Sequence, residues 1–332
     1  MDFIIPWVDD NDPAWRKEYL KRKNGESLGT EESRFRDWDN LQYWFRGVEK
    51  FTPWVNKIHF VTWGHLPKWL NINHPKLNIV NHTDYIPKEY LPTFNSRTID
   101  LNYHRIEELS EEYVLFNDDV FLLDFLKKED FFKNGKMRDM GVFDIIVGWR
   151  DYDHTILSGI SVITKYFSKT GTVRQKPFNW FNLKYGFFNN ITNLGILPIK
   201  RYGHPSFKEF HLAQPARKST LNLLWDKEFE KMHSACQPEF RDLHSVNHFV
   251  QRYYDLASNN FLPIDMRKRG SYFRLKHNSD PKLVADFIRK QKKPMVCLND
   301  YPDLDGELYT RMKDSVNNAF ECILPEKSSF EL

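Results

Sequence analysis

The sequence contains little cysteine. Cys236, Cys297 and Cys322 are odd in number and lie far apart in a chain of 332 residues. This pattern predicts neither a disulfide framework nor a cysteine-type zinc site. We therefore expect a protein that works in a reducing compartment.

Long apolar runs are also lacking. No stretch approaches the roughly 20 apolar residues that a membrane-spanning helix needs. Residues 2–10 carry neither a basic segment nor a long apolar one, so the sequence predicts no signal peptide. Together these absences favour a cytoplasmic, globular protein.

A strong excess of one charge sign is missing too. The 48 Lys and Arg residues nearly balance the 45 Asp and Glu residues, which argues against nucleic-acid binding. Two basic runs, residues 266–269 and 289–293, either touch anionic lipid at the inner membrane face or form solvated helix ends. Aromatic residues make up 16% of the chain, a share typical both of sugar-stacking sites and of large cores.

The most informative segment that is present joins an apolar strand to two adjacent carboxylates. Residues 114–116 are apolar, Asn117, Asp118 and Asp119 follow, and the hydrophobic pattern then resumes. Burying ionised aspartates without a partner costs several kcal/mol per ion. A divalent cation, Mg²⁺ or Mn²⁺, is the simplest remedy, and it would normally hold a diphosphate. The alternative is a turn capped by Asn117 and Asp118.

The first 125 residues alternate predicted strands with predicted helices. Strands are expected at residues 3–8, 58–62, 77–80 and 114–116, and helices at residues 36–51 and 95–109. Such alternation predicts an α/β fold with a doubly wound, mostly parallel sheet, whose ligands bind beyond the carboxyl ends of the strands. The acidic turns after Val8 and Phe116 would lie at that edge.

The second half predicts a C-terminal helical lobe. Helices are expected at residues 220–232, 241–256 and 281–290, whereas residues 179–193 show no clear period and residues 325–332 read as a frayed tail. Residues 294–300 repeat the theme of an apolar strand that ends in Asn-Asp. We expect three units: residues 1–165 as the nucleotide-sugar core, 166–290 as the acceptor and phosphate lobe, and 291–332 as a return strand of the same catalytic unit.

Four blocks of sequence, in order, resemble the Stealth-type sugar-1-phosphate transferases. This family includes bacterial capsular polysaccharide phosphotransferases and the catalytic subunit of the lysosomal-enzyme GlcNAc-1-phosphotransferase. The blocks are residues 5–13, 39–119, 210–256 and 297–300. The second, which closes with Asn117-Asp118-Asp119, is the most specific. In the first, Pro6, Asp9 and Asp10 replace the Thr, Asn and Gly that are usual.

The resemblance implies a GT-A-like fold and a definite reaction. A UDP-sugar would give its sugar 1-phosphate to a hydroxyl of a growing polysaccharide or lipid-linked glycan, forming a phosphodiester in capsule or exopolysaccharide synthesis and releasing UMP. Attack at phosphorus loads charge onto phosphoryl oxygens, so catalysis is mainly electrostatic stabilisation and positioning.

The same resemblance assigns the catalytic groups. It implies that Asp118, Asp119 and Asp300 hold Mg²⁺ or Mn²⁺, although turn capping would also explain each of them. Arg241 would clamp phosphates with two hydrogen bonds, or form a surface ion pair. His211 is the candidate general base.

Further residues are expected to bind substrate. His104 competes with His211 for the base role, or is a structural histidine. Trp7, Val8 and Asp10 would line the nucleotide pocket. Asn95 and Ser96 would present backbone N–H groups to a phosphate, or simply cap a helix. Arg105 would pair with the diphosphate or with Asp39.

Three other functions fit parts of the pattern. A GT-A glycosyltransferase would share the donor and the metal but release UDP. A non-catalytic sugar- or nucleotide-binding protein would keep the scaffold without turnover. His244 and His248 have metal-ligand spacing on a predicted helix, but Ser245 stands where a zinc hydrolase of this pattern carries its glutamate base.

Overall fold

The computed structural model describes residues 1–23, 36–199 and 203–332. The described strands are β1 (Asp2–Pro6), β2 (Ile58–Thr62), β3 (Leu77–Asn81), β4 (Glu112–Leu115), β5 (Val120–Leu122), β6 (Phe132–Lys133), β7 (Lys136–Asp139), β8 (Phe143–Asp144), β9 (Ser206–Phe207), β10 (Gln214–Arg217), β11 (Phe261–Pro263), β12 (Gly270–Leu275) and β13 (Met295–Asp300).

The α-helices are α1 (Pro13–Arg22), α2 (Leu41–Phe51), α3 (His82–Tyr85), α4 (Ser96–Leu101), α5 (Asp151–Tyr166), α6 (Lys169–Gln175), α7 (Pro177–Trp180), α8 (Gly186–Ile196), α9 (Lys218–Lys227), α10 (Phe229–Cys236), α11 (Phe249–Ala257), α12 (Pro281–Arg289) and α13 (Gly306–Ile323). Short 3₁₀ turns are η2 (Lys88–Tyr90), η3 (Tyr103–Arg105), η4 (Lys128–Asp130), η5 (Leu183–Tyr185) and η6 (Met266–Lys268).

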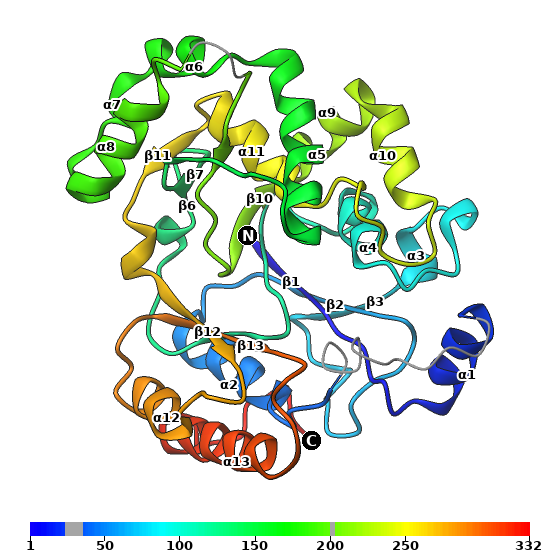
Figure 1. Ribbon diagram of the computed structural model, residues 1–332. Coiled ribbons are helices and arrows are strands. Elements are labelled where there is room, and N and C mark those ends of the chain that lie inside the picture. Colours follow the sequence, from blue (N-terminus) through cyan, green and yellow to red (C-terminus); the bar gives the residue numbers. More distant parts are fainter. Residues whose placement is uncertain (24–35, 200–202) are drawn as a thin grey trace.

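The largest sheet has the strand order β10-β4-β1-β2-β3, in which only β10 is antiparallel to its neighbour. Phe3, Ile4 and Ile5 of the central strand β1 are all fully buried, as expected for a parallel strand covered on both faces. Figure 1 shows α2, α12 and α13 on one side of this sheet and α5, α9, α10 and α11 on the other. The predicted mixed α/β architecture with a mostly parallel sheet is confirmed.

A second sheet joins the acidic turn to the far end of the chain. Its order is β12-β13-β5, with β12 parallel and β5 antiparallel to β13. Strand β5 begins directly after Asp119, and the backbone N–H of Leu298 donates to the Asp119 carbonyl over 2.8 Å. The two Asp-bearing segments predicted from sequence are thus neighbours in space.

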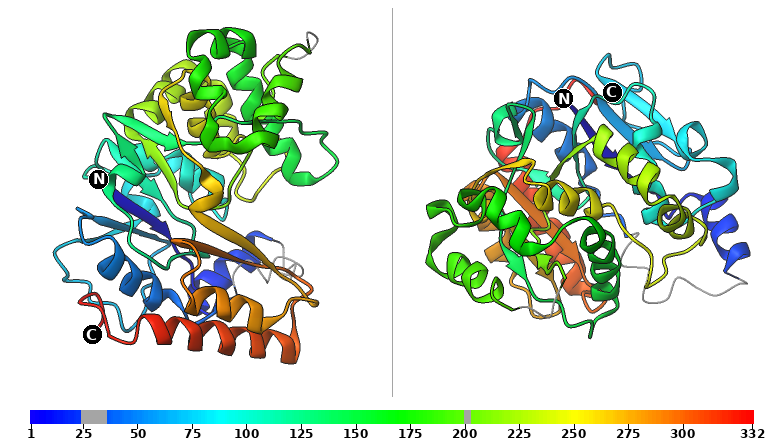
Figure 2. Two further views of the ribbon diagram at one scale, coloured as in Figure 1. Left: turned by 90° about the vertical axis from the view of Figure 1, so that its left-hand side faces the viewer. Right: turned by 90° about the horizontal axis from the view of Figure 1, so that it is seen from above.

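The C-terminal segments pack together. Strand β12 pairs with β13, and helix α12 packs against α13. Both helices lie below the sheets in the left view of Figure 2. The expected division into units ending at residues 165 and 290 stays a prediction.

Three predicted helices are shorter than expected. The helix expected at residues 36–51 begins only at Leu41. The helix expected at residues 95–109 ends at Leu101. The Asn102 side chain donates a hydrogen bond to the Thr98 carbonyl, and a 3₁₀ turn follows. The helix expected at residues 241–256 begins only at Phe249. Asp242 accepts hydrogen bonds from the His244 backbone N–H and from the Ser245 hydroxyl, and such local bonds compete with a helix.

Three other expectations need correction. The helix expected at residues 220–232 is divided at Glu228 into α9 and α10. The aperiodic residues 179–193 form parts of α7 and α8. The tail is not frayed: Phe330 is buried, and Glu331 pairs with Arg46 over 2.9 Å. Among the described helices, none is both long and apolar enough to cross a membrane.

Candidate active site

A cavity of about 430 Å³ opens beyond the carboxyl ends of β1, β4 and β13. Trp7 and Val8 follow β1, Asp118 and Asp119 follow β4, and Asp300 ends β13. This is the edge at which parallel strands usually present their ligand-binding residues. Helix α4 and the start of α11 supply the opposite side of the cavity.

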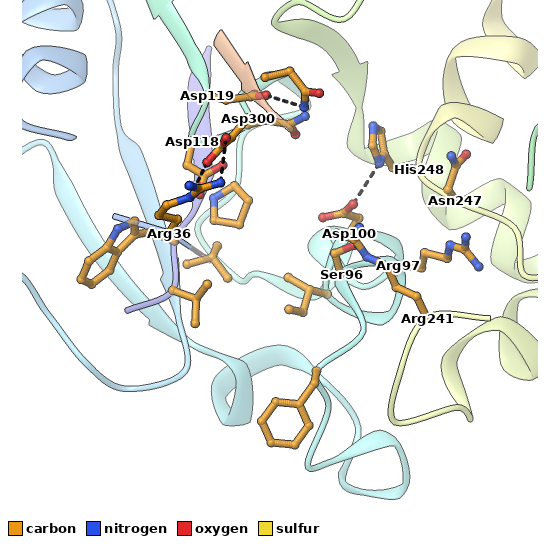
Figure 3. Close-up of a pocket in the computed structure, with 18 of the residues that line it drawn as sticks. Arg36, Ser96, Arg97, Asp100, Asp118, Asp119, Arg241, Asn247, His248 and Asp300 are labelled. Carbon is orange, nitrogen blue, oxygen red and sulfur yellow. Dashed lines mark hydrogen bonds and ion pairs between the residues drawn. The ribbon is translucent and has the colours of Figure 1, made fainter. Parts of the chain in front are cut away.

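One side of the cavity is a wall of carboxylates (Figure 3). Asp118 reaches the cavity, but protein surrounds it closely. This desolvation, together with the charge of the neighbouring Asp119 carboxylate, raises the pKa of Asp118 to about 7. Burial likewise raises the pKa of Asp300 to about 6, while the charge of Arg36 opposes that rise. A bound cation would stabilise such crowded carboxylates in their ionised form.

Asp119 has a half-satisfied carboxylate. Its Oδ2 accepts from Asn299 Nδ2 and from Cys297 Sγ, each at 3.3 Å, and lies 3.8 Å from His211 Nε2. Its Oδ1 is buried and has no hydrogen-bond partner among the described residues. An orphaned buried oxygen is costly unless a further group binds to it.

The chemistry of these side chains fits a hard cation at Asp118 and Asp119. Within the described part of the chain, Asp119, His211 and Cys297 form a cluster whose potential ligand atoms lie within 4.8 Å of one another. However, burial raises the pKa of Cys297 well above its ordinary value, so its thiol stays protonated and is a poor ligand. The carboxylate oxygens remain as the donors that Mg²⁺ and Mn²⁺ prefer.

Asp300 is engaged elsewhere. Arg36 Nε lies 2.9 Å from Asp300 Oδ2, and Trp38 Nε1 donates to the same oxygen over 3.1 Å. The side chain of Asp300 is only 9% exposed. In this geometry Asp300 anchors Arg36 beside the carboxylate wall, and its predicted role as a metal ligand stays a prediction.

The facing wall of the cavity is cationic and polar (Figure 3). Arg241 Nε donates to Ser96 Oγ over 3.0 Å, and Arg97 Nη2 donates to Thr155 Oγ1 over 2.7 Å. Both arginines are among the residues that line the cavity. Guanidinium groups offer several N–H donors in a planar fork that matches phosphate oxygens.

A second histidine lies in the same wall. His248 Nδ1 and Asp100 Oδ2 are 2.9 Å apart. If Nδ1 carries the proton and donates a hydrogen bond to the carboxylate, the Nε2 atom of His248 keeps its lone pair and can accept a proton. Three histidines line the cavity, His82, His211 and His248, and burial lowers the pKa of His82 to about 4.

Eight of the predicted site residues line this one cavity. They are Trp7, Val8, Ser96, Asp118, Asp119, His211, Arg241 and Asp300. They come from segments nearly 300 residues apart, from Trp7 to Asp300. The sequence blocks therefore converge in space.

Asp10, Asn95, His104 and Arg105 do not line the cavity, whose described lining residues lie elsewhere. Asp10 is 8% exposed, and its burial raises its pKa. Asn95 caps α4, since its Oδ1 accepts from the Arg97 N–H over 3.1 Å. His104 packs beside Trp225, and desolvation lowers its pKa to about 3. The guanidinium of Arg105 stacks on the same indole and donates to Asn102, while Asp39 pairs with Lys313.

Sequence reasoning missed several lining residues: Arg36, Arg97, Asp100, Asn247 and His248. Arg97 directly follows the predicted Ser96 and could have been found as the neighbouring cation. His248 was weighed only as a zinc ligand on a helix that the structure does not contain, because helix α11 starts one residue later. Asp100 and His248 are 148 residues apart in the sequence, and no sequence pattern predicted that they would pair.

Comparisons with known proteins show which family the chain resembles. Residues 34–140 match the family described as Stealth protein CR2, conserved region 2. The chain is 42% identical to the capsular polysaccharide phosphotransferase WcwK of Streptococcus pneumoniae, covering 100% of this chain and 98% of that one. It is 36% identical to the receptor polysaccharide phosphotransferase WefC of Streptococcus gordonii, with coverages of 100% and 99%. It is 32% identical to the exopolysaccharide phosphotransferase cps2G of Lactiplantibacillus plantarum, with coverages of 100% and 96%.

Proposed function

Because this chain belongs to the Stealth-type family of capsular and exopolysaccharide phosphotransferases, we propose that it transfers a sugar 1-phosphate from a UDP-sugar to a hydroxyl of a glycan acceptor. The products are a phosphodiester and UMP. The chain is a phosphotransferase that acts in polysaccharide synthesis. Three points are proposals: the UDP-sugar donor, the release of UMP, and the similarity of the fold to GT-A enzymes.

The observation that carries the proposal is the pair of facing walls in one cavity. Asp118 and Asp119 stand on one side, and Arg97 and Arg241 stand on the other. A nucleoside diphosphate sugar needs both, because a cation neutralises its diphosphate and guanidinium groups hold the phosphoryl group that moves. A cavity with carboxylates alone would suit a cation but would not grip the transferred phosphate.

In the proposed reaction, one bond to the β-phosphorus forms and another breaks. The acceptor oxygen forms a bond to the β-phosphorus of the donor, and the bond from that phosphorus to the bridging oxygen breaks. UMP leaves with the bridging oxygen and its electron pair, and the acceptor proton passes to a base. Arg97 and Arg241 complement the charge that gathers on the non-bridging oxygens.

His211 is the proposed base, and His248 is its competitor. His211 Nε2 lies 3.8 Å from Asp119 Oδ2 and accepts a hydrogen bond from Asn117 Nδ2 over 3.2 Å. His248 is oriented by Asp100 in the opposite wall. The pH profiles of His211→Asn and His248→Asn should tell the two roles apart. Loss of the base should abolish the rise of kcat with pH. Loss of a histidine that only positions other groups should lower kcat and keep the shape of the profile.

Asp118 and Asp119 would hold Mg²⁺ or Mn²⁺, with Asp300 as a further carboxylate if Arg36 releases it. When bound, the cation supplies positive charge to the diphosphate and stabilises the leaving phosphate. The orphaned Oδ1 of Asp119 supports this assignment.

A glycosyltransferase that attacks the sugar carbon and releases UDP would use the same cavity. The two reactions differ in the nucleotide product. Purified protein should therefore be incubated with Mg²⁺ or Mn²⁺, a panel of UDP-sugars and a crude glycan acceptor, and UMP and UDP resolved by chromatography. Acceptor-dependent UMP supports the proposal. UDP would overturn it, and binding of the donor without either nucleotide product would favour a non-catalytic role.

A further inference from the structure

Helix α8 turns polar side chains toward the protein and mostly apolar side chains toward the solvent. Its buried positions include Asn189 and Asn193, which are 6% and 0% exposed. The Asn193 side chain donates to the carbonyls of Gly141 and Trp180 and accepts from the Phe143 N–H. The helix is therefore attached to the protein largely through polar bonds, and its apolar side chains other than the buried Ile196 are exposed.

The outward face and the turn before it form an apolar patch. We call this set the α8 patch: Phe178 (81% exposed), Leu183 (99%), Phe187 (73%), Phe188 (81%), Ile191 (47%) and Leu194 (62%). Positions 187, 191 and 194 are spaced by four and three residues, so they share a helix face. Contiguous exposed patches of this kind mark interaction sites in proteins that are otherwise well packed.

The patch lies apart from the cavity. Figure 1 shows α6, α7 and α8 at an outer corner of the helical lobe, and the left view of Figure 2 faces them. None of the described residues 166–199 lines the cavity. The patch is therefore separate from the cavity.

Basic residues outnumber acidic ones around the patch. From residue 154 to residue 208 the sequence has no Asp or Glu and has eight Lys or Arg. Arg174, Lys176 and Lys184 are exposed within this stretch. Arg267 of η6 reaches the same place, since its Nη2 lies 3.4 Å from the Lys184 carbonyl, but its charge is offset by an ion pair with Asp265 at 2.8 Å. Lys136 approaches Lys176 closely enough to lower the pKa of the Lys176 ammonium.

We propose that the α8 patch with its basic surround is a docking surface for an anionic lipid bilayer. Phe, Leu and Ile side chains enter the boundary between head groups and acyl chains, while lysines and arginines attract anionic head groups. A glycan partner fits less well, because the patch presents no carboxylate and no Trp or Tyr ring for pyranose stacking. The inference is independent of the donor and leaving group proposed above.

Vesicle co-sedimentation tests the proposal. Full-length protein should pellet with vesicles of phosphatidylglycerol and phosphatidylcholine, less with phosphatidylcholine alone, and less as salt is raised. The triple variant Phe188→Gln, Ile191→Gln, Leu194→Gln should bind the anionic vesicles at least about tenfold more weakly. Lys176→Glu with Lys184→Glu should weaken binding mainly at low salt.

Two controls keep the result specific. Leu283→Gln, which changes a 56% exposed residue on α12, should bind like the wild type. All variants should retain the wild-type melting temperature and the turnover of a soluble acceptor, because the patch residues do not line the cavity.

Absence of pelleting with anionic vesicles would overturn the proposal, as would equal pelleting of the wild type and the triple variant. A concentration-dependent dimer that the triple variant abolishes would show instead that a second copy covers the patch. Competition for the patch by a soluble polysaccharide would show a glycan surface.

Discussion

Asp119 is the residue at which sequence and geometry agree most closely. The sequence marked it as a costly carboxylate after an apolar strand, and the structure leaves its Oδ1 buried without a hydrogen-bond partner among the described residues. We expect Asp119→Asn to lower turnover by at least about 100-fold at saturating Mg²⁺, and to weaken Mn²⁺ binding measured by electron paramagnetic resonance. Asp124→Asn, at an exposed aspartate nearby, is the control. Turnover retained in Asp119→Asn would remove it from the site.

Arg241 tests the grip on phosphate. Arg241→Lys keeps the charge but loses the planar fork, so we expect kcat/KM to fall by roughly 100-fold, or about 3 kcal/mol. Arg97→Lys should show a similar loss because both groups line one wall. Steady-state kinetics measure this, with Arg174→Lys, an exposed arginine outside the cavity, as the matched control. Near wild-type kinetics in Arg241→Lys would contradict its role.

His104 carries a prediction about pH. Desolvation lowers the pKa of His104 to about 3 in the folded chain, below its ordinary 6.5. Below pH 6.5 the imidazole of His104 therefore binds a proton in the unfolded chain but not in the folded chain. The free energy of unfolding falls as the pH falls toward 3. Relative to His104→Asn, the wild type should lose up to about 1.4 kcal/mol of unfolding free energy per pH unit between pH 6 and 4.

Urea unfolding of both proteins across that range measures the difference. Curves that stay parallel would contradict the burial of a neutral imidazole. His104→Asn should keep the pH profile of turnover, because His104 does not line the cavity. If His104→Asn no longer shows the dependence of turnover on pH, His104 is again a candidate for the general base.

At the scale of elements, sequence periodicity predicted the strands better than the helix ends. Strand β2 at Ile58–Thr62 coincides with its prediction, because five consecutive buried residues leave little choice of position. The helix ends depended on side-chain bonds, such as those of Asn102 and Asp242. The α8 segment had no readable period because its buried face is polar, which reverses the pattern that sequence reasoning assumes.

The C-terminal tail shows how a short element gains order from packing. Phe330 is 2% exposed, and its ring lies 5.3 Å from that of Phe45. We expect Phe330→Ala to cost about 3 to 5 kcal/mol of unfolding free energy. Thermal unfolding should show a lower melting temperature, whereas Phe178→Ala, at an 81% exposed ring, should not. Equal melting temperatures would mean that the tail adds nothing to stability.

At the scale of the molecule, the cavity depends on contacts that no local pattern encodes. The sequence placed the acidic turns at one sheet edge, since parallel strands share that edge. It could not place Arg97 and His248 opposite them, because their positions follow from how α4, α5 and the start of α11 pack against one another. The motifs predicted one wall, and tertiary packing supplied much of the other.

The buried ion pair between Arg252 and Asp139 joins the lobe to its small sheet. Arg252 Nε donates to Asp139 Oδ2 over 2.6 Å, and its Nη2 donates to Asp139 Oδ1 and to the Lys208 carbonyl, each over 3.0 Å. The last bond fixes the chain three residues before His211, so the pair also steadies one side of the site. Removing one partner leaves the other charge buried and unpaired, which costs about 3 to 5 kcal/mol.

We therefore expect Arg252→Met and Asp139→Leu each to lower the unfolding free energy by that amount, and the double variant to recover a large part of it. Denaturant unfolding of the four proteins closes the cycle. The double variant should still lose activity, because the bond that holds Lys208 is gone. Single variants as stable as the wild type would show that the pair is dispensable to the fold, and full activity in the double variant would show that His211 is positioned without it.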